Sequence, residues 1–242
     1  MSVLRIDGLT KSFRGFTAVD DVSLAVAPGE VRGLIGSNGA GKSTLLHLIY
    51  GKLEADSGSI SFAGSEVTRM PAHRRARQGM GLVFQLTSVF DELTVEENLM
   101  LGALPKKPRT RLSLDLDEVE RILRLVELED VRHRHASELS HGRQQWLEIG
   151  MVLLAKPSLL LLDEPTSGMT QAESRRTANL LIELQATRAT EAIVVVEHNF
   201  EFIRLVSDRV TVMHRGQVLA DGTIDEVQGN PEVQASFLGR LH

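Results

Sequence analysis

The sequence predicts an α/β fold in which a core of alternating strands and helices is interrupted by a helical insertion. Two continuous apolar runs, Leu159–Leu162 and Ala192–Val196, are typical of strands buried on both faces of a parallel sheet. Between about residues 93 and 154 apolar residues recur at helical spacing, for example Leu116, Val119, Ile122, Leu123 and Val126. A chain of 242 residues can bury a substantial core as one domain. We therefore expect a single domain over 1–242, with a core at about 1–92 and 155–242 and a helical subdomain at about 93–154.

The amino-terminal part predicts several short strands and one helix. Alternating or β-rich runs predict strands at Val3–Leu9, Val22–Val26, Glu30–Ile35, Gly58–Phe62 and Gly81–Phe84. Pro28-Gly29 predicts a turn before the third of these runs. A helix is predicted at Lys42–Tyr50, directly after a glycine-rich loop.

Composition excludes several classes of protein. Apolar residues make up 42% of the chain and charged residues 24%, as in ordinary globular proteins. The net charge of −5 argues against nucleic acid as the main partner, and the lack of cysteine excludes disulfides and cysteine-ligated metals. No apolar stretch approaches the roughly 20 residues that span a bilayer, and we see no secretory signal. We expect a soluble protein whose membrane role, if it has one, comes through a partner.

The glycine-rich loop fits the pattern of a phosphate-binding loop. Glycines let successive backbone N–H groups curl around phosphates, and the N-terminus of the following helix adds its positive dipole. A structural turn with chance glycines is the alternative, but the predicted strand before the loop and the helix after it favour phosphate binding. Lys42 would contact the β- and γ-phosphates, and Ser43 would hold Mg²⁺. The predicted cradle consists of Gly36, Ser37, Asn38, Gly39, Ala40, Gly41, Lys42, Ser43 and Thr44.

Two acidic residues follow the apolar strand Leu159–Leu162. A carboxylate at the carboxyl end of such a strand lies beside the phosphate loop, where Asp163 can complete the shell of Mg²⁺. Glu164 is placed to orient and deprotonate an attacking water. An acidic pair that only complements a helix dipole is the alternative. The preceding strand and the phosphate loop favour a catalytic pair.

These motifs, together with Leu139-Ser140-His141-Gly142-Arg143, resemble the ATP-binding subunit of an ATP-binding cassette (ABC) transporter from about Leu4 onward. The resemblance implies a P-loop NTPase (RecA-like) core, an antiparallel β subdomain and an inserted α-helical subdomain. The five-residue segment is similar to the family's Leu-Ser-Gly-Gly-Gln motif, which binds the γ-phosphate of the ATP held by the opposite subunit. Ser140 and Gly142 keep the pattern, whereas His141 and Arg143 depart from it. Ser140 is also a good N-cap for an amphipathic helix, and both roles are compatible.

Further roles rest on the resemblance alone. Gln85 corresponds to the glutamine that senses Mg²⁺ and water, and His198 to the histidine that contacts the γ-phosphate. Phe13 matches the aromatic residue that stacks on adenine, with Phe16 as a competitor. Thr170 stands where the family's dimer-contact loop ends in Asp, which puts that contact in doubt.

The resemblance also implies the partners. A single cassette without a membrane span is similar to the separate subunits of bacterial importers, at the cytoplasmic face of the inner membrane. Expected partners are membrane permease subunits, a second ATP-binding subunit, identical or related, and indirectly a periplasmic solute-binding protein. The segment 139–151, the loop 167–170 and the tail 227–239 resemble the branched-chain amino acid and urea importer group. His141 and the Trp-Leu-Glu-Ile that begins at Trp146 resemble the urea type most.

Two other classes use a similar loop. A soluble ABC-type ATPase of DNA repair or translation usually carries two cassettes or long coiled-coil insertions. A small kinase would need a lid that covers its phosphate acceptor. This alternative also does not explain the segment 139–143. Two basic runs, Arg69–Arg77 and Lys106–Arg111, are expected to be solvated surface.

Overall fold

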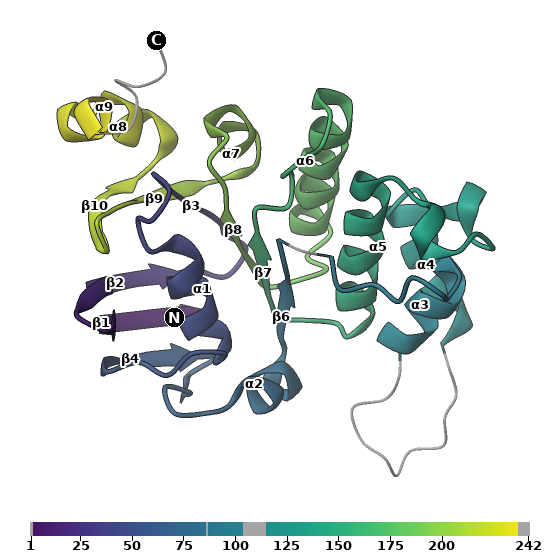
Figure 1. The fold of residues 1–242 in the computed structure, drawn as a ribbon, viewed down its shortest axis with the longest axis horizontal. Coiled ribbons are helices and arrows are strands. Elements are labelled where there is room, and N and C mark those ends of the chain that lie inside the picture. Colours follow the sequence, from purple (N-terminus) through teal and green to yellow (C-terminus); the bar gives the residue numbers. More distant parts are fainter. Residues whose placement is uncertain (1, 86, 104–114, 237–242) are drawn as a thin grey trace.

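The computed structural model describes residues 2–85, 87–103 and 115–236, in which strands form two sheets (Figure 1). The smaller sheet is antiparallel in the order β2-β1-β4-β5. Its strands are β1 (Leu4–Phe13), β2 (Phe16–Val26), β4 (Ser57–Phe62) and β5 (Ser65–Glu66). Leu4, Ile6 and Leu9 of β1 are buried, whereas Arg5 is exposed. The alternating pattern therefore turns one face of this sheet into the core.

The larger sheet has the order β10-β9-β3-β8-β7-β6. Its strands are β3 (Val31–Gly36), β6 (Met80–Val83), β7 (Leu159–Asp163), β8 (Ala192–Val196), β9 (Arg209–His214) and β10 (Gln217–Gly222). The pairs within the order β9-β3-β8-β7-β6 are parallel, and β10 adds an antiparallel edge. Every residue of β3, β7 and β8 is buried, as the continuous apolar runs of β7 and β8 predict.

Two hydrophobic cores lie on opposite faces of the larger sheet. Leu159 and Leu161 of β7 join the core beneath the antiparallel sheet, which includes Leu45 of α1 (Lys42–Tyr50). Leu160 and Leu162 join the other core, with residues of the long helices. Helices α6 (Gln171–Ala186) and α7 (Phe200–Val206) supply part of this second core. Successive residues of one buried strand thus stabilise two different layers.

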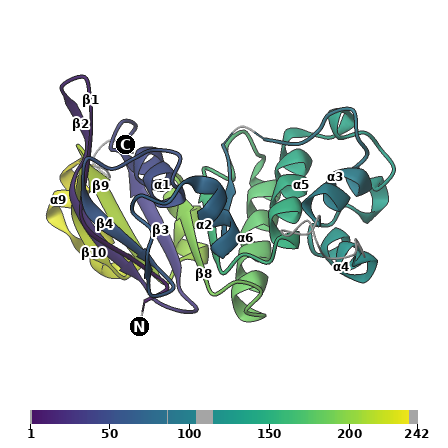
Figure 2. The same ribbon diagram turned by 90° about the horizontal axis from the view of Figure 1, so that it is seen from below.

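Three helices gather at one end of the molecule, farthest from the antiparallel sheet (Figures 1 and 2). They are α3 (Val95–Gly102), α4 (Leu116–Leu125) and α5 (His141–Leu154), which we call the helical region. Gly150 permits their close approach, because a Cβ atom there would lie 2.9 Å from Leu99 Cδ2. The chain also forms α2 (Ala72–Gln78), α8 (Ile224–Gly229), α9 (Pro231–Ser236) and two short 3₁₀ turns at Glu129–Val131 and Ala136–Glu138. Within the described residues, no helix has the length and apolar character needed to cross a bilayer.

The run Arg69–Arg77 is only partly the solvated surface that the sequence predicts. Arg69, Arg74 and Arg77 are exposed, but Arg75 is 1% exposed, so the prediction is wrong for this residue. Its guanidinium donates to the carbonyl oxygens of Leu48 and Ile49 at 2.7 and 2.6 Å, at the end of α1. It also donates to carbonyls of the segment before α2. Backbone acceptors distant in sequence therefore compensate the burial of this cation. The other basic run, Lys106–Arg111, lies outside the described residues.

Candidate functional site

The glycine-rich loop connects β3 to α1 and presents the N-terminus of that helix. Gly41 has φ +102°, and a Cβ atom there would lie 2.1 Å from the carbonyl oxygen of Ala18. Only glycine fits this position, because a side chain would clash with backbone. The loop can therefore curl tightly and direct N–H groups toward an anion.

Lys42 lies inside the curl of the loop. Its ammonium donates to the carbonyl oxygens of Gly36 at 2.9 Å and Ser37 at 3.2 Å. Burial lowers the pKa of this ammonium, and the carboxylates of Glu164 and Asp163 partly offset the effect. A buried cation at this place can contact negatively charged phosphates.

Asp163, the last residue of β7, lies beside the first turn of α1. The hydroxyl of Ser43 donates to Asp163 Oδ1 at 3.0 Å. Asp163 is 4% exposed, and burial raises the pKa of its carboxyl while the Ser43 hydrogen bond lowers it. A hydroxyl and one carboxylate fit Mg²⁺, which binds few protein oxygens and completes its shell with phosphates and water. In the part of the chain that the structure describes, no cluster of three or more acidic or histidine side chains offers a complete metal cage.

Glu164 meets side chains from two other segments. The amide of Gln85 donates to Glu164 Oε2 at 3.0 Å, and His198 Nδ1 lies 3.9 Å from the same oxygen. The backbone of Glu164 has φ +48°, an uncommon conformation for a residue with a side chain. Glu164 and Gln85 line a cavity of about 320 Å³ together with the loop residues Asn38, Gly39, Ala40, Gly41, Lys42, Ser43 and Thr44. The structure thus brings together the predicted cradle and the predicted catalytic acid.

A further acidic residue was missed by sequence reasoning. Glu197 is fully buried, and its carboxylate accepts hydrogen bonds from the backbone and hydroxyl of Thr166 at 2.9 and 2.5 Å. Its other oxygen accepts the His198 N–H at 3.2 Å. Glu197 therefore ties the loop after Glu164 to the segment that carries His198. The available signal was its position directly after the apolar run Ala192–Val196, as Asp163 directly follows the run Leu159–Leu162.

Ser140 and Gly142 lie at the start of α5, away from the cavity. The Ser140 hydroxyl caps α5 by accepting the Arg143 N–H at 3.4 Å, and it donates to Glu173 Oε1 at 3.4 Å. A Cβ atom on Gly142 would lie 2.7 Å from the same Glu173 oxygen. Thr170 forms a capping box with Glu173 at the start of α6. Neither Ser140 nor Gly142 lines the cavity of the glycine-rich loop.

Both candidate adenine-stacking residues lie at the tip of the β1–β2 hairpin. Phe13 and Phe16 are 42% and 59% exposed, and they pair with each other across the two strands. Lys11 Nζ lies 5.5 Å from the centre of the Phe13 ring. Each ring therefore presents a surface for stacking, but neither lines the cavity.

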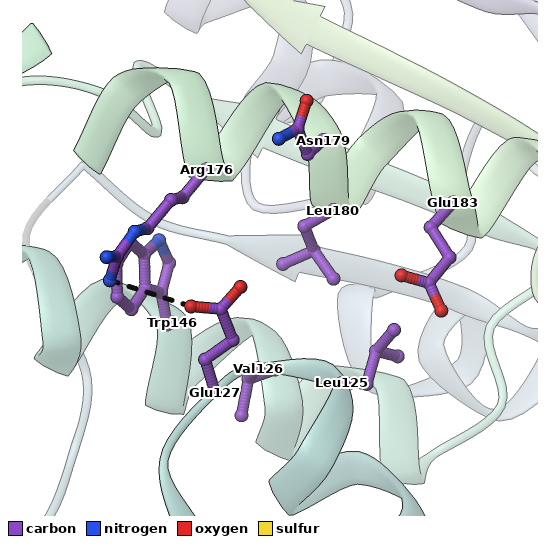
Figure 3. A pocket seen from close by; sticks show the side chains of 8 residues that line it. All are labelled: Leu125, Val126, Glu127, Trp146, Arg176, Asn179, Leu180 and Glu183. Atoms are coloured by element: carbon purple, nitrogen blue, oxygen red, sulfur yellow. Dashed lines mark ion pairs between the residues drawn. The ribbon is translucent and has the colours of Figure 1, made fainter. Parts of the chain in front are cut away.

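Two more hollows flank α5. One is a groove of about 720 Å³ between β6, α2, α3 and α5, with a mainly apolar lining that includes Phe90, Leu101 and Met151. The other is a small cavity of about 50 Å³ where the end of α4 meets α5 and α6 (Figure 3). There Arg176 pairs with Glu127 at 3.5 Å and lies 6.0 Å from the centre of the Trp146 ring (Figure 3).

Comparisons with known proteins point to one family. The family model described as "ABC transporter" matches residues 19–167. The branched-chain amino acid transport ATP-binding protein BraF of Pseudomonas aeruginosa is 32% identical, and LivG of Escherichia coli 33%, each over 98% of both chains. The solved structure of the ADP conformation of MJ1267, an ATP-binding cassette of an ABC transporter, has a TM-score of 0.87 and 31% identity. That match covers 99% of this chain and 100% of the other.

The comparisons confirm the predicted fold class of an ABC ATPase with a P-loop core and mixed α/β sheets. They also confirm the prediction that the chain is an ATP-hydrolysing cassette. The chain belongs to the ABC transporter family, as an ATP-binding subunit.

Proposed function

We propose that this chain is the ATP-hydrolysing subunit of a membrane importer of the branched-chain amino acid group. One observation carries the proposal. Ser43 with Asp163, and Gln85 with Glu164, each lie at 3.0 Å, so four polar side chains from distant segments converge on one loop. An arrangement that only stabilised the fold would not need a base, a metal ligand and a lysine around the same cavity.

The residues divide the chemistry among them. The loop N–H groups and Lys42 would hold the phosphates, and Ser43, Asp163 and Gln85 would hold Mg²⁺. When bound, Mg²⁺ would neutralise charge that develops on the phosphates. Glu164 would accept the proton of the attacking water, while Gln85 and His198 fix the position of that water. Phe13 would stack on adenine.

A second ATP-binding subunit would complete each site. Ser140 supplies a hydroxyl and Gly142 lies in the first turn of α5, and both features suit a phosphate, yet neither residue lines the cavity of its own chain. We infer that they serve the nucleotide of an identical or related partner chain. Residues 1–92 and 155–242 would then form the core of one domain, and 93–154 a helical subdomain that moves against it.

Membrane permease subunits would dock on the apolar groove beside α5, and the protein would then lie at the cytoplasmic face of the membrane. Phe90 is 53% exposed and Leu101 37% exposed along this groove, and an exposed apolar groove is typical of a protein interface. A periplasmic solute-binding protein would act indirectly through the permease. The net charge of −5 does not favour nucleic acid as a partner.

A Glu164→Gln variant tests the ATPase assignment. The amide cannot accept the proton of water, whereas the phosphate cradle is unchanged, so hydrolysis should fall by at least about 100-fold with ATP binding retained. Phosphate release measured without any second substrate also separates an ATPase from a kinase. Glu201→Gln, an exposed change on α7, is the matched control and should keep the parental rate. If Glu164→Gln hydrolysed ATP at the parental rate, Glu164 would not be the catalytic base.

The cargo is tested in the reconstituted importer with its solute-binding protein. The relatives named for branched-chain amino acids support leucine, isoleucine or valine. The sequence alone favours urea, through His141 and the residues that begin at Trp146. Leucine should stimulate ATP hydrolysis if the proposal holds. Stimulation by urea and not by leucine would reverse the choice of cargo and leave the ATPase mechanism unaffected.

A further inference from the structure

Glu173 of α6 connects the starts of two helices through one carboxylate. Its Oε2 accepts the backbone N–H and the hydroxyl of Thr170, at 2.9 and 2.8 Å, and so completes the capping box of α6. Its Oε1 faces the start of α5, where it accepts the hydroxyl of Ser140 at 3.4 Å. A Cβ atom on Gly142 would lie 2.7 Å from the same oxygen. The carboxylate therefore lies against both residues that would serve the nucleotide of a partner chain.

This carboxylate is charged at neutral pH and is not paired with a cation. Hydrogen bonds from the backbone and the hydroxyl of the N-cap residue lower the pKa of Glu173. On α5, Arg143 pairs with Asp130 at 3.0 Å. On α6, Arg176 pairs with Glu127 at 3.5 Å. Because the arginines of both helices are held by other carboxylates, the negative charge beside the start of α5 is not offset by an ion pair.

The hydroxyl of Ser140 has a single proton to donate. In one chain by itself that proton goes to Glu173, and the hydroxyl oxygen accepts the Arg143 N–H at 3.4 Å. Ser140 is exposed, so a phosphate held by a second chain can reach it. A phosphate oxygen is also an acceptor, and it would compete with Glu173 for the same proton. It would bring further negative charge next to the carboxylate, which opposes its approach.

We propose that Glu173 opposes the closure of two ATP-loaded chains, because it holds the Ser140 hydroxyl until the γ-phosphate of the other chain's ATP displaces it. The inference rests on the proposed function, since it concerns the site that two chains would share. Glu173 does not line the ATP cavity of its own chain, so it should change association and not the affinity of a single chain for ATP. Once hydrolysis has removed the γ-phosphate, the carboxylate would regain the hydroxyl and favour separation.

The chain offers a closely matched control in Glu226 of α8. Glu226 forms the same capping box with Thr223, and a Cβ atom on Gly222 would lie 2.7 Å from its Oε2. The helix α8 lies at the opposite end of the molecule from α5 (Figure 1). Glu226→Gln therefore repeats the change at the cap and at the glycine contact without touching Ser140.

The test measures self-association of the chain with ATP and Mg²⁺ by analytical ultracentrifugation, in a Glu164→Gln background that prevents hydrolysis. Adding Glu173→Gln keeps an oxygen for the cap and removes the charge, so the dissociation constant of the dimer should fall by about fivefold or more. Adding Glu226→Gln should leave the constant unchanged. The affinity of single chains for ATP, measured at a concentration too low for dimers, should be the same for all three proteins.

Two outcomes overturn the inference. A smaller fall than this, or none, would mean that Glu173 mainly caps α6. A rise in the dissociation constant would mean that the carboxylate supports closure by orienting the Ser140 hydroxyl. Because the expected change is a gain of association, damage to the fold cannot imitate it. Failure of the proposed function looks different, because the Glu164→Gln chain would then stay monomeric with ATP, with or without Glu173→Gln.

Discussion

The two sides of α5 differ in how completely they are packed. Toward α6, Trp146 is 4% exposed, and its indole N–H donates to the hydroxyl of the fully buried Thr177 at 2.9 Å. Only about 50 Å³ of cavity remains there (Figure 3). Toward β6 and α3, the same helix lines an open groove of about 720 Å³, and Oε2 of the lining residue Glu148 is buried without a hydrogen-bond partner among the described residues.

The difference separates a closed contact within the chain from a surface to which we propose that a partner binds. Interiors of folded proteins are close-packed, and their buried polar atoms are hydrogen-bonded. The α6 side of α5 meets both conditions, and the groove side meets neither. Substitutions on the two sides should therefore change different properties, namely the free energy of unfolding and the affinity for a partner.

The largest effect on stability is expected from Trp146→Ala. Removing this ring from a closed contact should lower the free energy of unfolding by about 3–5 kcal/mol, because it leaves a cavity and removes the indole hydrogen bond to Thr177. On the groove side of the same helix, Met151→Ala should cost only about 1 kcal/mol, because Met151 is partly exposed already. Urea unfolding followed by circular dichroism measures both. Equal losses would show that the two sides are equally packed.

An intermediate effect is expected from Glu148→Gln, and it depends on pH. The pKa of Glu148 is raised from 4.5 to about 7 in the folded chain. The stability that goes with the protonated group is present below about pH 4.5 and is lost as the pH rises through 7. The glutamine variant avoids this loss, so at pH 8 it should exceed the parental chain by up to about 3 kcal/mol. Unfolding at pH 5 and pH 8 gives the comparison, and an advantage independent of pH would contradict the assignment.

The smallest effect is expected from Arg176→Met. Arg176 and Glu127 form an ion pair at 3.5 Å, but their side chains are 56% and 61% exposed. Exposed pairs contribute about 0–1 kcal/mol, and the methionine keeps an apolar stem over Trp146. The free energy of unfolding should change by less than about 0.5 kcal/mol, and high salt should remove the difference. A larger loss would mean that the pair, and not the indole, holds α5 against α6.

The sequence predicted the elements near the site well, because local patterns determine them. The helix predicted at Lys42–Tyr50 has the same bounds in the structure, and the apolar runs after residue 158 form buried parallel strands. The antiparallel pair β9–β10 was not predicted, although its strands complete the larger sheet. The roles assigned to Glu164, His198 and Ser140 stay predictions until they are tested by substitution.

The sequence alone could not predict which single polar residues are buried. Arg75 belongs to a basic run, and its acceptors at Leu48 and Ile49 lie on another helix. Glu148 occupies a helical position that is compatible with an exposed face, and only the packing of β6 and α3 shows that it is buried. The burial of Glu197 is likewise compensated by hydrogen bonds from Thr166, which lies 31 positions away in the chain. Such contacts join segments that are distant in the sequence, so no short sequence motif predicts them.

The backbone at Glu164 places catalysis and stability in conflict. This residue has φ +48° and is followed by Pro165, so it holds a conformation in which glycine would be the least strained residue. Keeping a side chain there costs on the order of 1–3 kcal/mol. Substitutions chosen only for a higher melting temperature would therefore favour glycine at this position and would eliminate the carboxylate. A thermostable version of this ATPase has to be engineered elsewhere, with this one strained residue retained.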